Sequence, residues 1–207
     1  MITIATQIAI SKSNIKAVYR AMPSNDIRYY LNGMLIQHNG ISTRLICTDG
    51  HRIHVVQQAG DNPLGEMIEF IIPAAQVLAM IKGKDTAVIV SYDSETKKVS
   101  IQTSTGTTTV DAVDGRFPDY LRILAPASGT LTPELACINP AYVLDADLSL
   151  RDYLGISKNK IAPVAICQRG DNVAVLSHEN FMAAIMPLRS SAVKPCDAVN
   201  PDLLKSL

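Results

Sequence analysis

The sequence predicts an α+β protein made of three copies of one unit, in which a strand is followed by a short helix and three more strands. The first observation is that an apolar, strand-like run ends three times at a residue that favours the start of a helix. These junctions lie at residues 10/11, 72/73 and 138/139, which are 62 and 66 residues apart. The second observation is that β-rich runs separated by turn residues follow each helical stretch. We therefore expect antiparallel sheets with short helices covering one face.

The first unit is expected at residues 1–60. Its apolar lead strand covers residues 2–10, and Ser11 then caps a helix over residues 12–22. Asn-Gly and Asp-Gly pairs, which are typical of hairpin turns, separate the strands that follow. These three strands are predicted at residues 29–37, 43–48 and 51–57.

The second unit is expected at residues 66–126, after a linker that is rich in glycine. A short apolar strand at 69–72 leads to Pro73, which opens a helix over residues 74–81. Three strands are predicted to follow at residues 86–92, 98–103 and 107–113. We interpret the first two units together as one complete domain, residues 1–126.

The third unit is expected at residues 127–191 and would form half a domain. Its lead strand is predicted at 135–138, and its helix begins with Asn139 as cap and Pro140 in the first turn and continues to Leu144. The following strands are predicted at residues 162–168, 172–176 and 181–188. Residues 192–207 show weak periodicity and are interpreted as a C-terminal extension.

Composition excludes several classes of protein. Lysine plus arginine equals aspartate plus glutamate, 19 each in 207 residues, which disfavours binding to nucleic acid through bulk positive charge and leaves a basic stripe on one face as the alternative. No window reaches the roughly 18 apolar residues of a membrane span, and the start lacks the basic segment of a signal peptide. We therefore expect a cytoplasmic protein. Four scattered cysteines (Cys47, Cys137, Cys167 and Cys196) favour neither a zinc site nor a disulfide framework, and no metal or cofactor is expected.

An enzyme is not expected either. Asp49, His51 and Ser42 have the residue types of a hydrolase, but no spacing brings a nucleophile to a base and an oxyanion site. The pair of Asp49 and Gly50 is better interpreted as a hairpin turn.

Three motifs are similar to a known family. They are Arg28-Tyr-Tyr-Leu-Asn-Gly33, Thr48-Asp-Gly-His-Arg52, and Asp114-Gly-Arg-Phe-Pro-Asp-Tyr120 with Arg122. In order and spacing they resemble the middle domain of the bacterial replicative sliding clamp, the beta subunit of DNA polymerase III. Residues 142–144 and 186–189 resemble the second half of the clamp's last domain. The resemblance implies a DNA clamp-like fold of one and a half clamp domains, without the first domain and the first half of the last.

The family implies a function without covalent chemistry. Clamps encircle duplex DNA without reading its sequence, and they tether polymerases and other partners as processivity factors. Helices with basic side chains line the ring. Lys12, Lys16 and Arg20 form such a stripe at helical spacing, although a solvated helix face would look the same, and the helix dipole alone could explain Lys82 and Lys84. The residues expected to face DNA are Lys12, Lys16, Arg20, Arg28, Lys82, Lys84, Arg151 and Lys158.

The resemblance also implies a pocket for short peptide motifs of polymerases and the clamp loader, between the middle and last domains. Apolar walls would hold a leucine or phenylalanine anchor, and polar groups would fix its direction. Leu31 and the 186–188 segment could equally be plain core and strand. The expected wall is Leu31, Thr48, Gly50, His51, Arg52, Ile53, Pro118, Arg122, Ile123, Val173, Val175, Met186, Pro187, Leu188 and Arg189.

Assembly follows from counting units. The resemblance implies rings of twelve units, so four chains of three units would close one, and we expect a head-to-tail homotetramer. The alternatives are a dimer in which two third units pair about a two-fold axis, and a mixed ring with a full-length clamp. A second function remains open, namely a clamp-like interaction protein that does not encircle DNA and competes for, or regulates, the partners of a sliding clamp.

Overall fold

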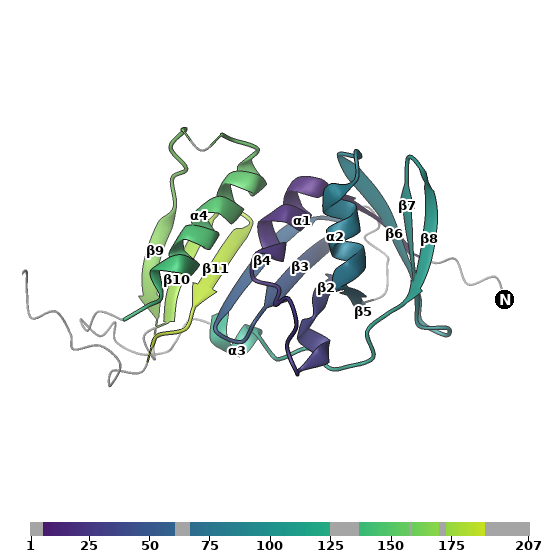
Figure 1. Ribbon diagram of the computed structural model, residues 1–207, viewed down its shortest axis with the longest axis horizontal. Coiled ribbons are helices and arrows are strands. Elements are labelled where there is room, and N and C mark those ends of the chain that lie inside the picture. The colour runs from purple at the N-terminus through teal and green to yellow at the C-terminus, as the bar shows by residue number, and fades with distance from the viewer. Residues whose placement is uncertain (1–5, 61–66, 125–136, 158, 170–172, 189–207) are drawn as a thin grey trace, which may run out of the picture.

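Two antiparallel sheets and a row of three helices form the molecule in the computed structural model (Figure 1). The structure describes residues 6–60, 67–124, 137–157, 159–169 and 173–188. One sheet has four strands in the order β1-β6-β7-β8, and the other has seven in the order β5-β2-β3-β4-β11-β10-β9. The helices α1, α2 and α4 lie on the same side of the strands (Figure 1). This arrangement confirms the predicted α+β class.

The first unit differs from prediction mainly where its second strand begins. Residues 29–31 form a turn of 3-10 helix instead of a strand, because the Asn32 side chain bonds the backbone of Asp26 through both of its polar atoms. The predicted cap is confirmed, since Ser11 Oγ accepts a hydrogen bond from the Asn14 amide at 3.3 Å. The elements are β1 (Thr6–Ser11), α1 (Lys12–Tyr19), η1 (Tyr29–Leu31), β2 (Gly33–His38), β3 (Ser42–Thr48) and β4 (Arg52–Ala59).

The second unit follows its prediction closely and adds one short helix. That helix, α3, comes after the Phe117-Pro118 segment and had no periodic signal in the sequence. The linker before the unit and the boundary near residue 126 lie outside the described residues. The elements are β5 (Ile68–Pro73), α2 (Ala74–Lys82), β6 (Ala87–Asp93), β7 (Lys98–Thr103), β8 (Gly106–Asp111) and α3 (Leu121–Leu124).

The third unit has a longer helix than predicted. Asn139 Oδ1 accepts from the Ala141 amide as the predicted cap, but the helix runs 15 residues and ends at Gly155 with a φ of 63°. Of the predicted lead strand, residues 135–136 lie outside the described residues, and 137–138 are not in a strand. The extension from residue 192 is not described. The elements are α4 (Pro140–Leu154), β9 (Ala165–Arg169), β10 (Val173–His178) and β11 (Phe181–Ile185).

Units one and two are interlocked because each lends its lead strand to the other. Strand β1 of unit one pairs with β6 of unit two, and β5 of unit two pairs with β2 of unit one. Helices α1 and α2 pack side by side above these strands (Figure 1). Neither sheet is complete without a strand from the other unit.

Units one and three meet where β4 pairs antiparallel with β11, which makes the seven-stranded sheet continuous. Above the sheet, α4 packs along α1, and Arg20 of α1 forms an ion pair with Asp152 of α4 at 2.8 Å. Beneath these helices, Nδ1 of the fully buried His54 lies 3.0 Å from Ser149 Oγ. The junction thus combines strand pairing with buried polar contacts.

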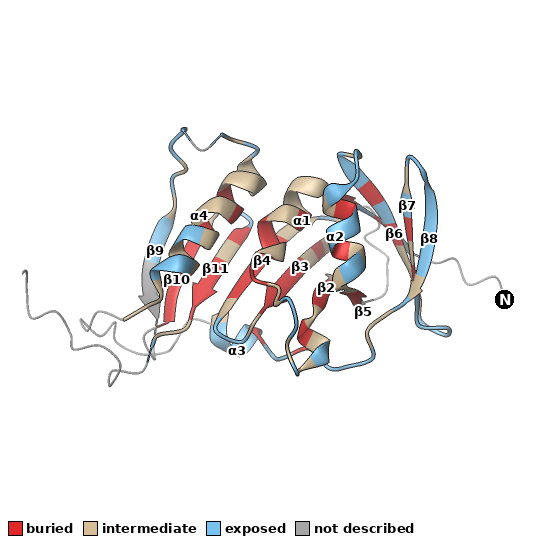
Figure 2. Cartoon of the chain, in the orientation of Figure 1, coloured by how far each residue is buried: buried red, intermediate tan, exposed pale blue. Residues whose placement is uncertain are grey.

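The hydrophobic core lies on both faces of the seven-stranded sheet (Figure 2). The larger cluster fills the space between the sheet and the helices and includes Ile15, Met34 and Leu150. A smaller cluster on the opposite face includes Leu31, Ile53 and Val175. None of the described helices is both long enough and apolar enough to cross a membrane.

Burial of His54 predicts how stability depends on pH. Burial, with the nearby Arg52 charge, lowers the pKa of His54 from 6.5 to about 3. Between these values the unfolded chain binds a proton that the folded chain does not, so the free energy of unfolding falls as pH drops. The contribution is about 1.4 kcal/mol per pH unit. We expect His54→Gln to flatten the pH dependence of urea unfolding between pH 6.5 and 4.

His51→Gln is the matched control, because His51 is exposed on the same hairpin. The loss of slope should be larger in the His54 variant than in this one. An unchanged slope in the His54 variant would contradict the prediction.

Candidate functional site

An apolar pocket lies at the junction of units one and three, below the ends of the strands and beside α3. It offers about 180 Å³ of space open to water. The strand register explains its position, because Ile53 at the start of β4 lies directly opposite Ala184 of β11. Its lining residues are Arg28, Leu31, Thr48, Gly50, Arg52, Ile53, Pro118, Tyr120, Ile123, Ala184 and Met186.

The hairpin turn at Asp49 and Gly50 forms one wall, and its own hydrogen bonds fix its shape. Asp49 Oδ1 accepts from the amides of His51 and Arg52, each at 2.9 Å. Thr48 Oγ1 donates to the Arg52 carbonyl at 2.7 Å and accepts from the Gly50 amide at 3.1 Å. Gly50 has a φ of 86°, as a glycine in such a turn permits. These bonds give Asp49 a structural role and confirm the predicted turn.

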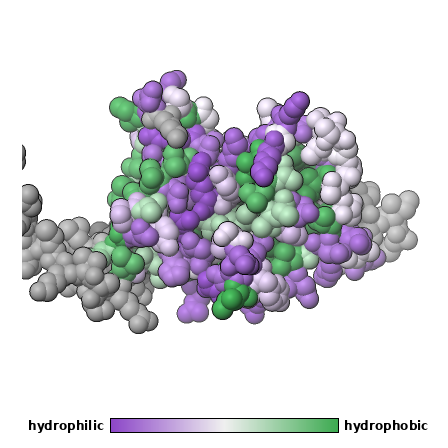
Figure 3. All heavy atoms as spheres, viewed as in Figure 1, coloured by the Kyte–Doolittle hydropathy of each residue, from purple (hydrophilic) through white to green (hydrophobic). Residues whose placement is uncertain are grey.

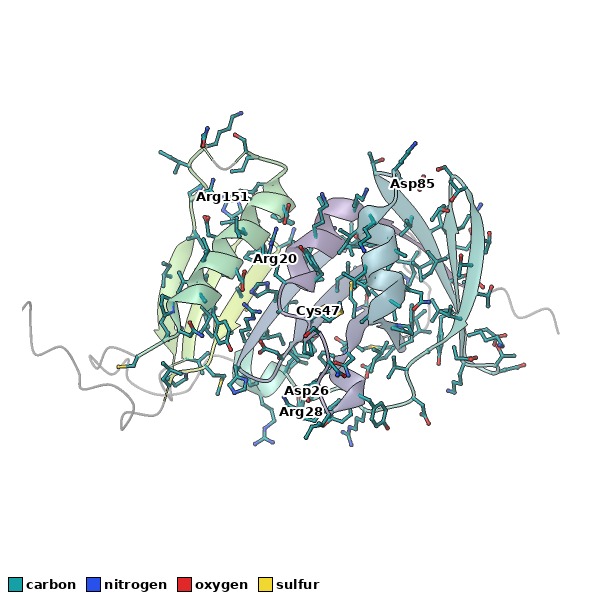
Figure 4. All side chains as sticks on the ribbon, viewed as in Figure 1. Arg20, Asp26, Arg28, Cys47, Asp85 and Arg151 are labelled. Atoms are coloured by element: carbon teal, nitrogen blue, oxygen red, sulfur yellow. The ribbon has the colours of Figure 1, made fainter. Side chains whose placement is uncertain are left out.

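Arg28 places a fixed positive charge at the pocket. Its guanidinium bonds both carboxylate oxygens of Asp26, at 2.9 and 2.7 Å, and also donates to the Asp49 carbonyl at 2.9 Å. These hydrogen bonds, led by the side-chain bond from Arg28, lower the pKa of Asp26 to about 2. Figure 4 shows Arg28 and Asp26 together at the edge of the molecule, away from Arg20 and Arg151. We had expected Arg28 on the DNA-facing surface, and we now assign it to the pocket.

Arg52 joins the pocket to the third unit. It forms ion pairs with Asp49, at 3.1 Å, and with Asp145 of α4. Its guanidinium carbon also lies 4.5 Å from the ring centre of Tyr142. Only 13% of the side chain is exposed. Its charge is therefore compensated within the protein, and its main effect is to hold α4 against the turn.

The structure brings together about half of the predicted pocket residues. Eight line the cavity, namely Leu31, Thr48, Gly50, Arg52, Ile53, Pro118, Ile123 and Met186. His51, Arg122 and Leu188 are exposed outside the lining, and Pro187 is partly buried there. Val173 and Val175 are buried in the core beneath the pocket, where strand alternation directs them. Arg189 lies outside the described residues.

Sequence reasoning missed three lining residues: Arg28, Tyr120 and Ala184. Tyr120 ends the third motif, so its position was a usable signal. Alternation along the last strand also pointed to Ala184, which lies two residues before Met186.

The predicted basic residues on the helices differ in whether they form hydrogen bonds or ion pairs within the protein. Lys12 donates to the carbonyl of Gly83 at the end of α2, and Arg20 is paired with Asp152. Arg151 pairs with Asp147 at 2.8 Å and also donates to backbone carbonyls after α4. Within the described part of the chain, none of the predicted lysines forms an ion pair, and Lys16, Lys82 and Lys84 have no side-chain hydrogen bond either. Lys158 is not described.

Helix α4 differs from α1 in charge. It carries Asp145, Asp147 and Asp152 against a single Arg151, whereas α1 has Lys12 and Lys16 and no acidic residue. The face toward the viewer is largely hydrophilic where α1 and α4 adjoin (Figure 3). Among the described helices, the lysines without an ion pair therefore lie on α1 and at the end of α2. The described residues contain no cluster of three or more side chains that could hold a metal ion.

Gly50→Ala tests the coupling between the turn and Arg28. A Cβ at this position would come within 2.6 Å of Arg28 Nη1, in a left-handed backbone conformation. We expect a loss of about 1 kcal/mol from backbone strain alone, and a further loss because Arg28 must move. Gly155→Ala is the matched control, with a φ of 63° and open space around its Cβ. Equal losses of unfolding free energy in the two variants would contradict a role for Arg28.

Comparison with known proteins agrees with this geometry. Residues 6–119, more than half of the chain, match the family model of the DNA polymerase III beta subunit, central domain. The beta sliding clamp of Vibrio cholerae is 31% identical over 163 residues, which cover 74% of this chain and 43% of the relative. That of Pseudomonas aeruginosa is 34% identical over 143 residues, which cover 66% of this chain and 38% of the relative. The chain thus spans about two fifths of the length of these relatives.

Solved structures show the same fold at lower identity. The DNA polymerase III beta subunit of Thermotoga maritima has a TM-score of 0.70 at 15% identity, covering 91% of this chain and 68% of that chain. The beta clamp of Helicobacter pylori, bound to a DNA ligase peptide, has a TM-score of 0.70 at 14% identity, covering 88% and 65%. The resemblance drawn from the three motifs is confirmed. This chain belongs to the DNA polymerase III beta subunit family, the family of the beta sliding clamps.

Proposed function

We propose that this chain is a clamp-type processivity factor, which surrounds duplex DNA as a ring and tethers a partner protein through its pocket. The observation that carries the proposal is the pocket itself. Its walls come from the β3-β4 turn, the α3 segment and the end of β11, and they meet only because unit three docks on unit one. A chain that kept the clamp fold but no longer bound a partner would not need these three segments to converge.

The pocket suits a short peptide. Leu31, Ile53 and Ile123 supply apolar walls for a leucine or phenylalanine anchor, and Arg28, held in place by its ion pair with Asp26, supplies a hydrogen-bond donor that would orient a polar neighbour. The partners would be peptide motifs of the kind found in polymerases and clamp loaders. The Helicobacter pylori clamp that binds a ligase peptide supports this class of ligand.

The helix side would face the DNA. Lysines without internal partners are suited to phosphates, because such contacts need charge but no fixed geometry, and they are independent of sequence. Lys16, Lys82 and Lys84 are the main candidates among the described residues, with Lys12 beside them. The role involves no covalent chemistry, and it would be carried out in the cytoplasm.

The ring would contain four chains. Three units per chain and twelve units per ring require this number, and the row of helices would then form a continuous inner surface. The acidic character of α4 favours a second candidate, a clamp-like protein that holds partner peptides without encircling DNA. The two candidates differ in whether the helix lysines contribute to DNA binding.

Replacing two of the free lysines tests the DNA-facing surface. We expect Lys16→Glu combined with Lys84→Glu to weaken binding of a fluorescent DNA duplex. Plotting the logarithm of the binding constant against that of salt concentration should give a slope smaller by about 2.

Lys97→Glu with Lys98→Glu makes the same charge change on the β6-β7 hairpin and serves as the control. The ion pair of Lys98 with the exposed Asp111, at 3.3 Å, lies on the surface and contributes little, so the fold should tolerate the change. Equal effects of the two double variants would reject the helix face and favour the non-encircling candidate.

A charge placed in the pocket tests peptide binding. Ile123 is 37% exposed in the free chain, so the fold should tolerate Ile123→Lys, but a bound peptide would cover the new ammonium group, and we expect affinity for a peptide with leucine and phenylalanine anchors to fall about tenfold or more. Leu121→Lys is the matched control, because Leu121 lies on the same short helix and does not line the pocket. Fluorescence anisotropy measures both. Loss of affinity in the control alone would place the peptide elsewhere.

A further inference from the structure

Strand β9 forms an edge of the seven-stranded sheet, and its position in the unit shows what normally covers such an edge. It is the first strand after its helix, as β2 and β6 are in their units. Both β2 and β6 are covered by the lead strand of the sister unit. Within the described part of the chain, β9 pairs only with β10. Among the described residues, one side of its backbone therefore lacks the partner that the other two units have.

The exposed fractions of the apolar side chains on these strands differ in the same way. Met34 and Val88 are the second residues of β2 and β6, face the helices, and are 0% and 4% exposed. Ile166 is the second residue of β9, opposite Leu176 of the same helix-side core, and is 67% exposed. Ile166 therefore occupies a position that is buried in the other two units, where an adjacent strand covers it.

The register of the two existing lead strands follows one rule. The residue just before each helix pairs with the first residue of the covered strand, as Ser11 does with Ala87 and Pro73 with Gly33. The third residue before each helix accordingly pairs with the third residue of that strand, which is Ile71 opposite Leu35 in one case.

The segment before α4 begins along the same path. Cys137, three residues before α4, accepts a hydrogen bond from the Leu188 amide at 2.7 Å. Ile71, three residues before α2, accepts one from the Val113 amide at 3.0 Å. Ile138 also packs against the helix-side core. Unit three therefore presents both parts of a strand exchange, an edge that receives and a segment that gives.

We propose that two copies of this chain pair through their third units about a two-fold axis. Residues 137–139 of each copy would add to β9 of the other, which completes a domain of the kind that units one and two form. By the register rule, Cys137 of one copy would lie opposite Cys167 of the other, and Ile138 opposite Ile166.

A second copy fits this edge better than an unrelated partner because the exchange is reciprocal. Each copy gives one segment and receives one, so a single contact satisfies both edges. The pairing needs neither DNA nor a peptide and therefore does not depend on the proposed function. A ring of four chains would use it as one of two contacts, with β8 at the other edge, in place of the head-to-tail contacts expected from the sequence.

Cross-linking between copies tests the register. A short bis-maleimide added to the purified full chain should produce a covalent dimer on a denaturing gel. Cys137→Ser and Cys167→Ser should each remove this dimer, while Cys196→Ser, the matched control, should keep it. A dimer that persists in the first two variants, or depends on Cys196, would overturn the proposal.

Solution mass tests the contact without relying on the thiols. Light scattering of the wild type should give at least twice the chain mass of 22.4 kDa. Ile166→Glu should halve the mass, and because this side chain is exposed in the single chain, its circular dichroism should stay unchanged. Gln102→Glu, at an exposed position on the inner strand β7, is the control, and it should leave the mass as it is in the wild type.

The outcomes separate this proposal from the proposed function. A mass of one chain at all concentrations, or a mass insensitive to Ile166→Glu, would overturn the pairing. A dimer that forms as expected but binds no duplex would leave the pairing in place and reject the DNA-clamp role.

Discussion

The pairing of β4 with β11 is the contact on which the rest of the structure depends. It joins segments that are far apart in the chain, and both the continuous row of helices and the pocket require it. On one face of the sheet it brings α4 alongside α1, which extends the row of helices. At the strand ends it brings Ala184 and Met186 to the turn that carries Gly50, which closes the pocket. Apolar burial on both faces of this strand pair supplies most of the favourable free energy.

Polar groups at the same junction fix its register. Pairing with β3 fixes the faces of β4, so a slip of one residue would turn β11 over and carry Ser149 of α4 away from His54. Arg52 adds a second constraint, because its pairs with Asp49 and Asp145 tie the pocket turn to α4. Buried polar pairs of this kind contribute little net stability, but an alternative register would leave each of them without a partner. The pocket geometry is therefore determined by the same residues that align the two units.

Much of the fold was predictable from the sequence because helix caps and turns are local signals. Ser11 and Asn139 cap their helices through their own side chains, and the turn at Gly50 is held by neighbours. Failures came where distant contacts decide. Val173 and Val175 do lie on the pocket's face of the sheet, since Val175 pairs with Ala184, but they are one strand farther from the turn and are buried in the smaller core cluster. The sequence shows that Arg28 is charged, and it was expected to face DNA for that reason. Its hydrogen bonds to Asp26 and to the Asp49 carbonyl could be found only from the structure.

All unit contacts in this chain share one geometry. The reciprocal pairs β1-β6 and β5-β2, and the pair β4-β11, are antiparallel, and an antiparallel strand pair has a local two-fold axis perpendicular to the sheet. Rotation about such an axis keeps the helices of both units on the same side. Any further contact that repeats the pattern therefore keeps the lysines of α1 and α2 on the helix side and the pocket at the strand ends. Two-fold contacts at β9 and at β8 would thus extend the array without exchanging its faces, which is the condition that a closed ring of helices requires.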